Sequence, residues 1–424
     1  MRLLSWLRTR KPVGKRRKSV ARLRVEHLED RRCPAGYAIT DLGALGGTTS
    51  WANAINNAGQ VVGNAQTAGG LYHPFLYSGG VMTDLAPSFN DNCGATAIND
   101  SGQVVVSAGS LPTFNNAFLW TSSTGLIDLG HLPNSSVTIA RALDNATAVH
   151  GVQVVGESWL ASGGMHAFLW QDSSLSDLND PNLYPNVAAT GWVLTAAYGI
   201  NDSQHVVGWG THNGVSHGFR WQVGSAPPTD LGALPGQAAS FAYAVNQVGQ
   251  IAGRSVGSPS DPFLWTNGAM TALPKLRGTE SAYYYALGLN EASTIQVVGT
   301  LHDVYSGPYE RALLWQSGKV IELTQQIPGN AGWSNLNNAT GINDAGLVVG
   351  GGGRASGVNH AFLMTPTHGG KQLTATIDLD ANAAGWEWVV DATPRNDSDL
   401  LPSIRPGKSE RISLLTDLEI EPGM

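Results

Sequence analysis

The chain has 424 residues, of which 13% are charged and 52 are glycine, a length that suits two or three ordinary domains or one large repeat domain. Its net charge of −7 is divided unevenly: residues 1–32 carry 12 Lys and Arg against 3 Asp and Glu, and the remainder carries 13 against 29. An acidic body argues against nucleic acid as a partner of its surface, and the absence of a run of about 18 apolar residues argues against a transmembrane helix.

Residues 1–36 form a basic leader, which we expect to be disordered. Their one apolar stretch, residues 3–7, is shorter than the core of about 7–15 apolar residues that an ordinary signal peptide requires. The Leu-Glu-Asp-Arg-Arg sequence at 28–32 resembles the N-terminal segment of many large surface and secreted proteins of one bacterial phylum. That resemblance implies export to the cell surface or beyond; the alternative is a leader that binds nucleic acid. Cys33 and Cys93 form one disulfide in an exported chain or are two unrelated thiols.

A short repeat begins after the leader. An apolar strand, an Asn-x-x-Gly turn and a Val-Val strand occur at 54–63 and recur six times, with longer turns in two copies. Each copy is accompanied by a strand that ends in an aromatic residue, such as Phe168-Leu169-Trp170, and by a strand that ends in Asp-Leu. Tyr77 and Met364 stand six repeats apart, which gives a period of about 48 residues. Four short strands in such a period predict an all-β propeller.

The two ends of the repeat array are incomplete in complementary ways. It opens with an Asp-Leu strand at 37–42 and closes with a Phe-Leu-Met strand at 360–365. Pairing of these strands would complete a seventh four-stranded blade and hide two sheet edges. We therefore predict that residues 37–366 form a seven-bladed β-propeller whose ring is closed by the N-terminal and C-terminal strands in one shared blade.

The repeat motifs also carry a family resemblance. His166 to Trp170, Asp41 to Thr48 and Ala52 to Gly63 resemble the HAF-type extracellular repeat family, over about residues 37–366. The resemblance implies an exported repeat scaffold and supplies no catalytic residue. Residues 367–424 lack the repeat and are too few for a firm core. They resemble a degenerate tail from which the His-Glu-x-x-His of a zinc protease is missing.

Two recurrent polar positions invite a metal hypothesis. His73, His166, His217 and His360 each stand two residues before the Phe-type position, where the other blades have Asn116, Asp261 and Arg311. The Asn-Asp-x-Gly turns contain too few oxygen ligands for a calcium loop, and their Asn and Gly suit the turn itself. We therefore expect structural roles for both positions, with no metal and no cofactor.

Aromatic residues provide the candidate binding site. Trp120, Trp170, Trp221, Trp265 and Trp315 recur once per blade and are expected to pack blade against blade. Other aromatic residues fall outside that position, in or near connections where they could stack on a sugar. The candidates are Trp51, Trp159, Trp192, Trp209, Trp333 and Tyr284.

No catalytic motif accompanies these residues: Gly-x-Ser-x-Gly, P-loop, Cys-x-x-Cys and His-Glu-x-x-His patterns are all missing. The sequence favours a monomeric, non-catalytic scaffold at the cell surface or outside the cell, with a glycan or a surface protein as its partner. The alternative is a carbohydrate-binding or carbohydrate-active propeller with its site in the loops, since two carboxylates could converge from different blades.

Overall fold

The computed structural model describes residues 36–109, 116–303 and 309–367. All of the predicted leader except Gly36, all of the predicted tail except Thr367, and Cys33 lie outside these ranges. Cys93 lies in a buried strand, and burial raises the pKa of its thiol to about 12. Among the described residues, no helix is long and apolar enough to cross a bilayer.

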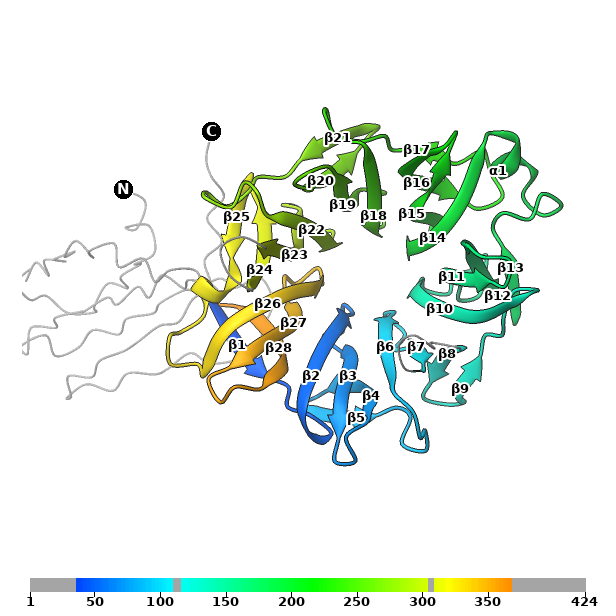
Figure 1. The fold of residues 1–424 in the computed structure, drawn as a ribbon. Helices are drawn as coiled ribbons and strands as arrows, with labels where there is room; N and C mark the ends of the chain where they lie inside the picture. Colours follow the sequence, from blue (N-terminus) through cyan, green and yellow to red (C-terminus); the bar gives the residue numbers. More distant parts are fainter. Residues whose placement is uncertain (1–35, 110–115, 304–308, 368–424) are drawn as a thin grey trace, which may run out of the picture. The chain divides into compact units, whose positions relative to one another are not determined.

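Seven four-stranded antiparallel sheets, numbered here as blades 1–7, surround a central opening (Figure 1). Blade 1 contains β2 (Gly46–Ile55), β3 (Val61–Thr67), β4 (Tyr72–Ser78) and β5 (Val81–Asp84). Blade 2 contains β6 (Cys93–Ile98), β7 (Val104–Ala108), β8 (Asn116–Thr121) and β9 (Gly125–Asp128). Blade 3 contains β10 (Ser135–Leu143), β11 (Val154–Leu160), β12 (Met165–Gln171) and β13 (Ser174–Asp177). The first strand of each sheet lies at the axis (Figure 1).

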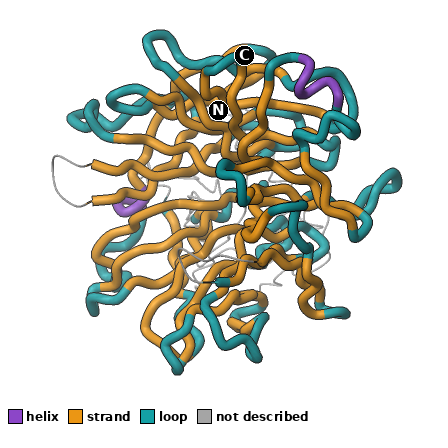
Figure 2. The backbone as a smooth tube through the Cα atoms, turned by 45° about the vertical axis from the view of Figure 1, so that its right-hand side comes forward, coloured by secondary structure: helices purple, strands orange, loops and turns teal. Residues whose placement is uncertain are grey.

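Blade 4 repeats this order with β14 (Trp192–Ile200), β15 (His205–His212), β16 (Val215–Gln222) and β17 (Thr229–Asp230). Blade 5 contains β18 (Ala239–Val245), β19 (Ile251–Val256), β20 (Asp261–Thr266) and β21 (Ala269–Ala272). Blade 6 contains β22 (Tyr283–Leu289), β23 (Gln296–Asp303), β24 (Tyr309–Gln316) and β25 (Lys319–Glu322). Strands dominate the described chain (Figure 2). Two short helical turns, α1 (Pro185–Ala189) and a 3₁₀ turn at Leu323–Gln326, were not predicted by the repeat pattern.

Blade 7 closes the ring as predicted. It consists of β26 (Trp333–Ile342), β27 (Val348–Arg354), β28 (Asn359–Pro366) and, from the start of the chain, β1 (Tyr37–Asp41). β1 pairs antiparallel with β28 in a register that runs from Tyr37 opposite Pro366 to Asp41 opposite Phe362. The all-β, seven-bladed architecture is therefore confirmed.

The Val-Val motif explains why the blades stack. Successive residues of a strand face opposite sides of its sheet. Val61 accordingly packs into the core between blades 7 and 1, and Val62 into the core between blades 1 and 2. The same division holds in every blade, so that the seven buried clusters each lie between two neighbouring blades. Both faces of the second strand are thus buried, which its continuous apolar run reflects.

The recurrent aromatic residues join these interfaces, as predicted. Trp221 of blade 4 packs in one cluster with Val155 and Leu169 of blade 3. Trp315 of blade 6 packs against Ala252 of blade 5, and its indole N–H donates to the carbonyl oxygen of Pro274 at 2.7 Å. The indole therefore fixes one blade against the next through apolar contact and one hydrogen bond.

Candidate functional site

A β-bulge sets one residue apart in each axial strand. The register between the first and second strands shifts after the same alanine in all seven blades. A bulge leaves one residue without a partner and turns it out of the regular alternation of faces. The alanine is common to all blades, but the bulged residue, which we term the lumen position, is not. The lumen positions are Asn53, Thr96, Arg141, Tyr198, Tyr243, Leu287 and Thr340.

The bulge also explains the glycine that follows Val-Val, or Ile251-Ala252 in blade 5, in every blade except blade 2, which has Val106. A Cβ on Gly63 would lie 2.0 Å from the carbonyl oxygen of Trp51. A Cβ on Gly299 would lie 1.9 Å from the carbonyl oxygen of Tyr285. Glycine therefore allows the bulged backbone to approach the second strand closely.

The lumen positions are of two kinds. In three blades the side chain donates a hydrogen bond to the common alanine of the next blade: Asn53 to the Ala95 carbonyl oxygen at 2.7 Å, Thr96 to Ala140 at 2.9 Å, and Thr340 to Ala52 at 2.9 Å. In the other four blades no described side chain donates to the corresponding carbonyl oxygen, which belongs to Ala197, Ala242, Ala286 or Ala339.

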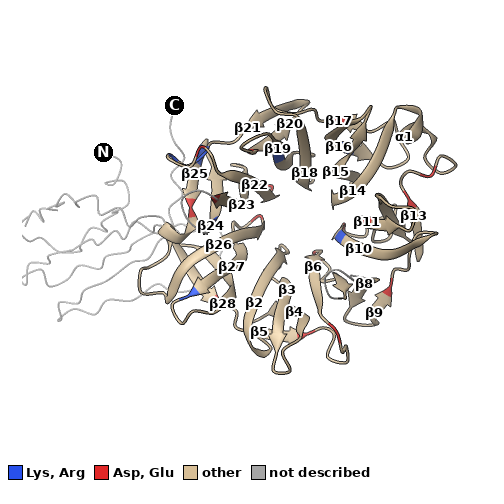
Figure 3. Cartoon of the chain, in the orientation of Figure 1, with Lys and Arg blue, Asp and Glu red and all other residues tan. Residues whose placement is uncertain are grey.

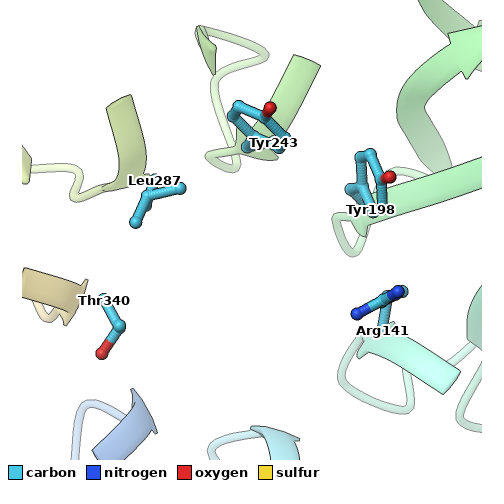
Figure 4. Close-up of a pocket in the computed structure, with 5 residues that line it drawn as sticks. All are labelled: Arg141, Tyr198, Tyr243, Leu287 and Thr340. Atoms are coloured by element: carbon cyan, nitrogen blue, oxygen red, sulfur yellow. The ribbon is translucent and has the colours of Figure 1, made fainter. Parts of the chain in front are cut away.

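A cavity of about 360 Å³ lies at the lumen positions of blades 3–7. Its lining consists of Arg141, Tyr198, Tyr243 and Leu287, which are the four lumen residues without such a bond, and of Thr340 (Figure 4). The five side chains come from blades 3–7 and surround one opening. The volume is at the lower end of the range of about 300–1,000 Å³ that small-molecule sites occupy.

Arg141 is the cation of this lining. Its Nε lies 3.0 Å from each carboxylate oxygen of Glu157, and its Nη2 donates to the same carboxylate. Burial alone would lower the pKa of Arg141, but the hydrogen bonds and the charge of Glu157 outweigh it and raise that pKa. Nη1 has no partner among the described residues, so it remains available as a donor.

Two tyrosines continue the wall. The guanidinium of Arg141 lies 5.6 Å from the ring centroid of Tyr198, and the ring of Tyr198 lies 5.6 Å from that of Tyr243. Burial raises the pKa of both phenols, that of Tyr243 despite the nearby charge of Arg254. Both hydroxyls therefore stay protonated at neutral pH and are hydrogen-bond donors.

A second aromatic layer supports this wall. The guanidinium of Arg254 lies 5.0 Å from the ring centroid of Phe241 and 4.5 Å from that of Tyr285. Trp209 lies 5.0 Å from Phe241, so that blades 4–6 form one continuous set of ring contacts. Charged residues are otherwise sparse on the strands of the ring (Figure 3).

At the end of the axial strands, the turn asparagines have a role that the sequence analysis missed. The Oδ1 of Asn56 accepts from the N–H of Gln60 at 2.9 Å, as the turn geometry predicts. Its amide also donates to the Asn99 carbonyl oxygen of the next blade at 3.0 Å. Equivalent bonds continue around the axis and return from Asn343 to the Asn56 carbonyl oxygen at 3.1 Å. Only blade 3 of the described ring interrupts them, because it has Asp144 in place of asparagine.

The residues after these asparagines form a second ring. The backbone N–H of each donates to a side-chain oxygen in the next blade; the members are Asn57, Asp100, Asn145, Asp202, Gln247, Glu291 and Asp344. Burial raises the pKa of Glu291, and the charges of Asp344, Asp202 and Asp100 raise it further. The carboxylates therefore share one electrostatic environment while they join the blades.

The recurrent histidines lie on the third strand of their blades, next to the outer strand. The Nδ1 atoms of His73, His166, His217 and His360 lie 2.7–2.9 Å from the carboxylates of Asp84, Asp177, Asp230 and Asp41. Each carboxylate belongs to the Asp-Leu strand of the same blade, which gives the histidines the structural role predicted for them. Blade 6 has the pair Arg311 and Glu322 instead, at 3.6 Å. In the described part of the chain, no group of three His, Cys, Asp or Glu side chains is arranged to hold a metal ion.

Asp230 offers a test of this edge. Burial raises its pKa, but hydrogen bonds from His217, His212 and the Gly232 N–H outweigh this and lower it. A lowered carboxyl pKa contributes stability above about pH 4 that is lost as the pH falls through the folded value. We expect Asp230→Asn to lower the free energy of unfolding by about 1 kcal/mol at pH 7, and the difference to vanish below about pH 3. Urea denaturation at both pH values measures it. Asp128→Asn is the control, because its partner is the neutral Asn116 at 3.1 Å. An equal, pH-independent loss in both variants would contradict the lowered pKa of Asp230.

The structure separates the six predicted aromatic candidates. Trp192 is 3% exposed and stacks on His212 at 4.5 Å, and Tyr284 is fully buried and bonds Thr279. Neither has the exposed ring that stacking on a sugar requires, so the expectation of exposure is wrong for both. They fall outside the repeat because they pack inserted segments onto their blades.

The other four candidates remain partly accessible. Trp209 belongs to the aromatic layer behind the cavity wall. Trp51 lies 5.6 Å from Tyr72, and Trp333 lies beneath the guanidinium of Arg354 at 4.6 Å. Trp159 is 50% exposed. The structure does not bring these four into one site, and the residues that do converge are the lumen positions.

Comparisons with known proteins show the fold alone. No protein-family model and no curated protein matches the chain. Among solved structures it is similar to TolB from Acinetobacter baumannii (TM-score 0.42, 10% identity, 73% of this chain and 64% of TolB). It is also similar to YCF48 from Cyanidioschyzon merolae (0.44, 10%, 77% and 98%) and to the Aleuria aurantia lectin in complex with Fucalpha1-6GlcNAc (0.37, 13%, 66% and 98%). The chain thus spans just under two thirds of TolB.

Proposed function

We propose that this protein is an exported, non-catalytic binding scaffold that holds its ligand in the central cavity of the propeller. One observation carries the proposal. At the lumen position the seven blades diverge in residue type, although the alanine before it and the strand after it are repeated. Five of the divergent side chains line one cavity, and four of them, Arg141, Tyr198, Tyr243 and Leu287, do not bond the common alanine of the next blade. A side chain that varies between the repeats and does not bond the next blade is available to contact a ligand.

Export and family membership belong to the same proposal. The Leu-Glu-Asp-Arg-Arg segment and the HAF-type motifs resemble exported repeat proteins, and a surface location suits a scaffold whose partner is a glycan or a surface protein. The chemistry of the cavity supports a binding role over catalysis. Both lining tyrosines are held protonated, and Glu157 is engaged by Arg141.

A thermal-shift screen of the full chain tests the proposal. Wild type, Tyr198→Ala/Tyr243→Ala and Trp159→Ala are screened against mono- and disaccharides, sugar acids and short peptides. We expect at least one compound to raise the Tm of wild type and Trp159→Ala, but not that of the cavity variant. A shift that survives the cavity variant and disappears in Trp159→Ala would place the site elsewhere. Conversion of a bound compound to a product would overturn the non-catalytic role.

A further inference from the structure

We infer that the ligand of the central cavity is a small organic molecule that carries a carboxylate group. The inference rests on the proposed function and names the ligand class of the same site. Three observations carry it. The cavity lining contains one cation and no anion, a second guanidinium lies behind the wall without a described carboxylate partner, and the rest of the lining is mainly aromatic and apolar.

The charged end of Arg141 faces the cavity. Its side chain is 38% exposed, whereas that of its partner Glu157 is 4% exposed and does not line the cavity. Glu157 engages Nε and Nη2, which leaves Nη1 as a donor without a partner among the described residues. Figure 4 shows a guanidinium nitrogen of Arg141 directed toward the centre of the opening. A negatively charged acceptor forms a stronger hydrogen bond with this donor than a neutral acceptor does.

Arg254 adds a charge that no described carboxylate balances. It follows the glycine of the second strand in blade 5, which is the place that Glu157 occupies in blade 3. Within the described ranges Arg254 forms no ion pair, and its Nε is buried without a hydrogen-bond partner. Its charge acts on the cavity wall, because it opposes the rise in pKa that burial causes in the phenols of Tyr198 and Tyr243. Two guanidiniums and the one carboxylate of Glu157 leave a net positive charge beside the cavity.

The acidic ring at the turns does not cancel this charge at the cavity. Its members follow the lumen positions by four residues, so the two levels are on the order of 10 Å apart along each axial strand. Solvent and salt screen charges at that separation, since the Debye length is about 8 Å at physiological ionic strength. A carboxylate is therefore attracted at the level of Arg141 and repelled at the level of Glu291 and Asp344.

The rest of the lining favours a small ligand with a carbon framework beside its charged group. The rings of Tyr198 and Tyr243 and the side chain of Leu287 border the cavity, and the hydroxyl of Thr340 already donates to the Ala52 carbonyl oxygen (Figure 4). Aromatic and aliphatic surfaces of this kind pack against the carbon atoms of a ligand. A volume of about 360 Å³ suits a sugar acid or the C-terminal residues of a peptide, and not a folded domain.

Matched pairs of ligands test the charge by isothermal titration of the full chain. One pair is glucuronate and glucose, and the other is the peptide N-acetyl-Gly-Gly-Phe with a free C-terminal carboxylate and the same peptide as its amide. We expect the carboxylate of at least one pair to bind at least tenfold more tightly than its neutral partner. This preference should shrink as NaCl rises from about 50 to about 500 mM. The pair that shows it tells whether the carboxylate belongs to a sugar or to a peptide.

The double variant Arg141→Gln/Glu157→Gln removes the cation without leaving a buried carboxylate unpaired. We expect its Tm to remain close to that of wild type and its preference for the carboxylate to be lost. Arg254→Gln should weaken the preference to a smaller extent, and Arg311→Gln, on the third strand of blade 6, should leave it unchanged. Equal or tighter binding of the neutral partners by wild type, or a preference that persists in the double variant, would overturn the carboxylate assignment and leave the proposed function standing. Binding of none of the probes to wild type would overturn both.

Discussion

Deletion of residues 37–41 from the full chain is expected to abolish the stable propeller. β1 pairs with β28 along five residues, and Asp41 binds both His360 at 2.8 Å and Arg354 at 3.1 Å. Tyr37 and Ile39 also pack on the cluster between blades 6 and 7. Loss of their partial burial removes about 3 kcal/mol in addition to the strand pairing, a large fraction of the roughly 5–15 kcal/mol that stabilises a typical domain. Urea denaturation followed by tryptophan fluorescence, together with size-exclusion chromatography, should show an aggregated or non-cooperative chain.

A transposed variant supplies the control for this deletion. The N–H of Thr367 donates to the carbonyl oxygen of Gly36 at 2.9 Å, so the two ends of the ring are adjacent. Residues 36–42 inserted after Thr367 through an Asn-Gly turn would give blade 7 the continuous order of the other blades. This variant should recover cooperative unfolding. An unchanged urea midpoint in the deletion variant would show that the ring does not depend on its closing strand.

The fold could be predicted from the sequence because repeated motifs indicate which strands occupy equivalent places in the structure. Seven copies of one strand pattern reveal the period, and the complementary ends reveal the shared blade. The two valines at 61 and 62 illustrate why the pattern is so regular: each is required by a different neighbouring blade. A repeated residue is thus one whose environment is repeated.

The same reasoning explains why the candidate site was missed. Alternation places residue 53 on one face of a strand, but a bulge changes the alternation at that point. The sequence did contain a sign of the lumen position: in each repeat, one residue of variable type lies between the common alanine and a following Ala or Gly. Trp192 and Tyr284 were misassigned for a related reason. Departure from the repeat indicated exposure, whereas these residues pack local insertions, including the segment with α1.

The second large expected effect is on stability and concerns Asp144, which interrupts the ring of asparagine hydrogen bonds in blade 3. Asp144 is 2% exposed, and its carboxylate receives the Gln153 N–H at 2.6 Å and faces His150 at 3.6 Å. Burial raises its pKa to about 7 from an ordinary 3.8, with a further contribution from Asp202 and an opposing one from His150. The folded state thus holds a proton that the unfolded state releases above about pH 4. Stability is therefore full below pH 4 and declines as the pH rises to about 7.

Asp144→Asn is expected to remove this decline. The variant amide can donate to the Asn201 carbonyl oxygen and complete the ring that six blades already form, and it carries no charge to bury. The difference in pKa sets an upper limit of ~4 kcal/mol, which relaxation of the turn around the charge reduces, so we expect a gain of about 2 kcal/mol at pH 8 and little change at pH 4. Urea denaturation at the two pH values measures the gain. Asn99→Asp is the matched control, because it places the same carboxyl group in blade 2 and should destabilise the chain at pH 8 only. A gain in Asp144→Asn that is equal at both pH values would show that the hydrogen bond alone, and not the buried charge, limits stability at this turn.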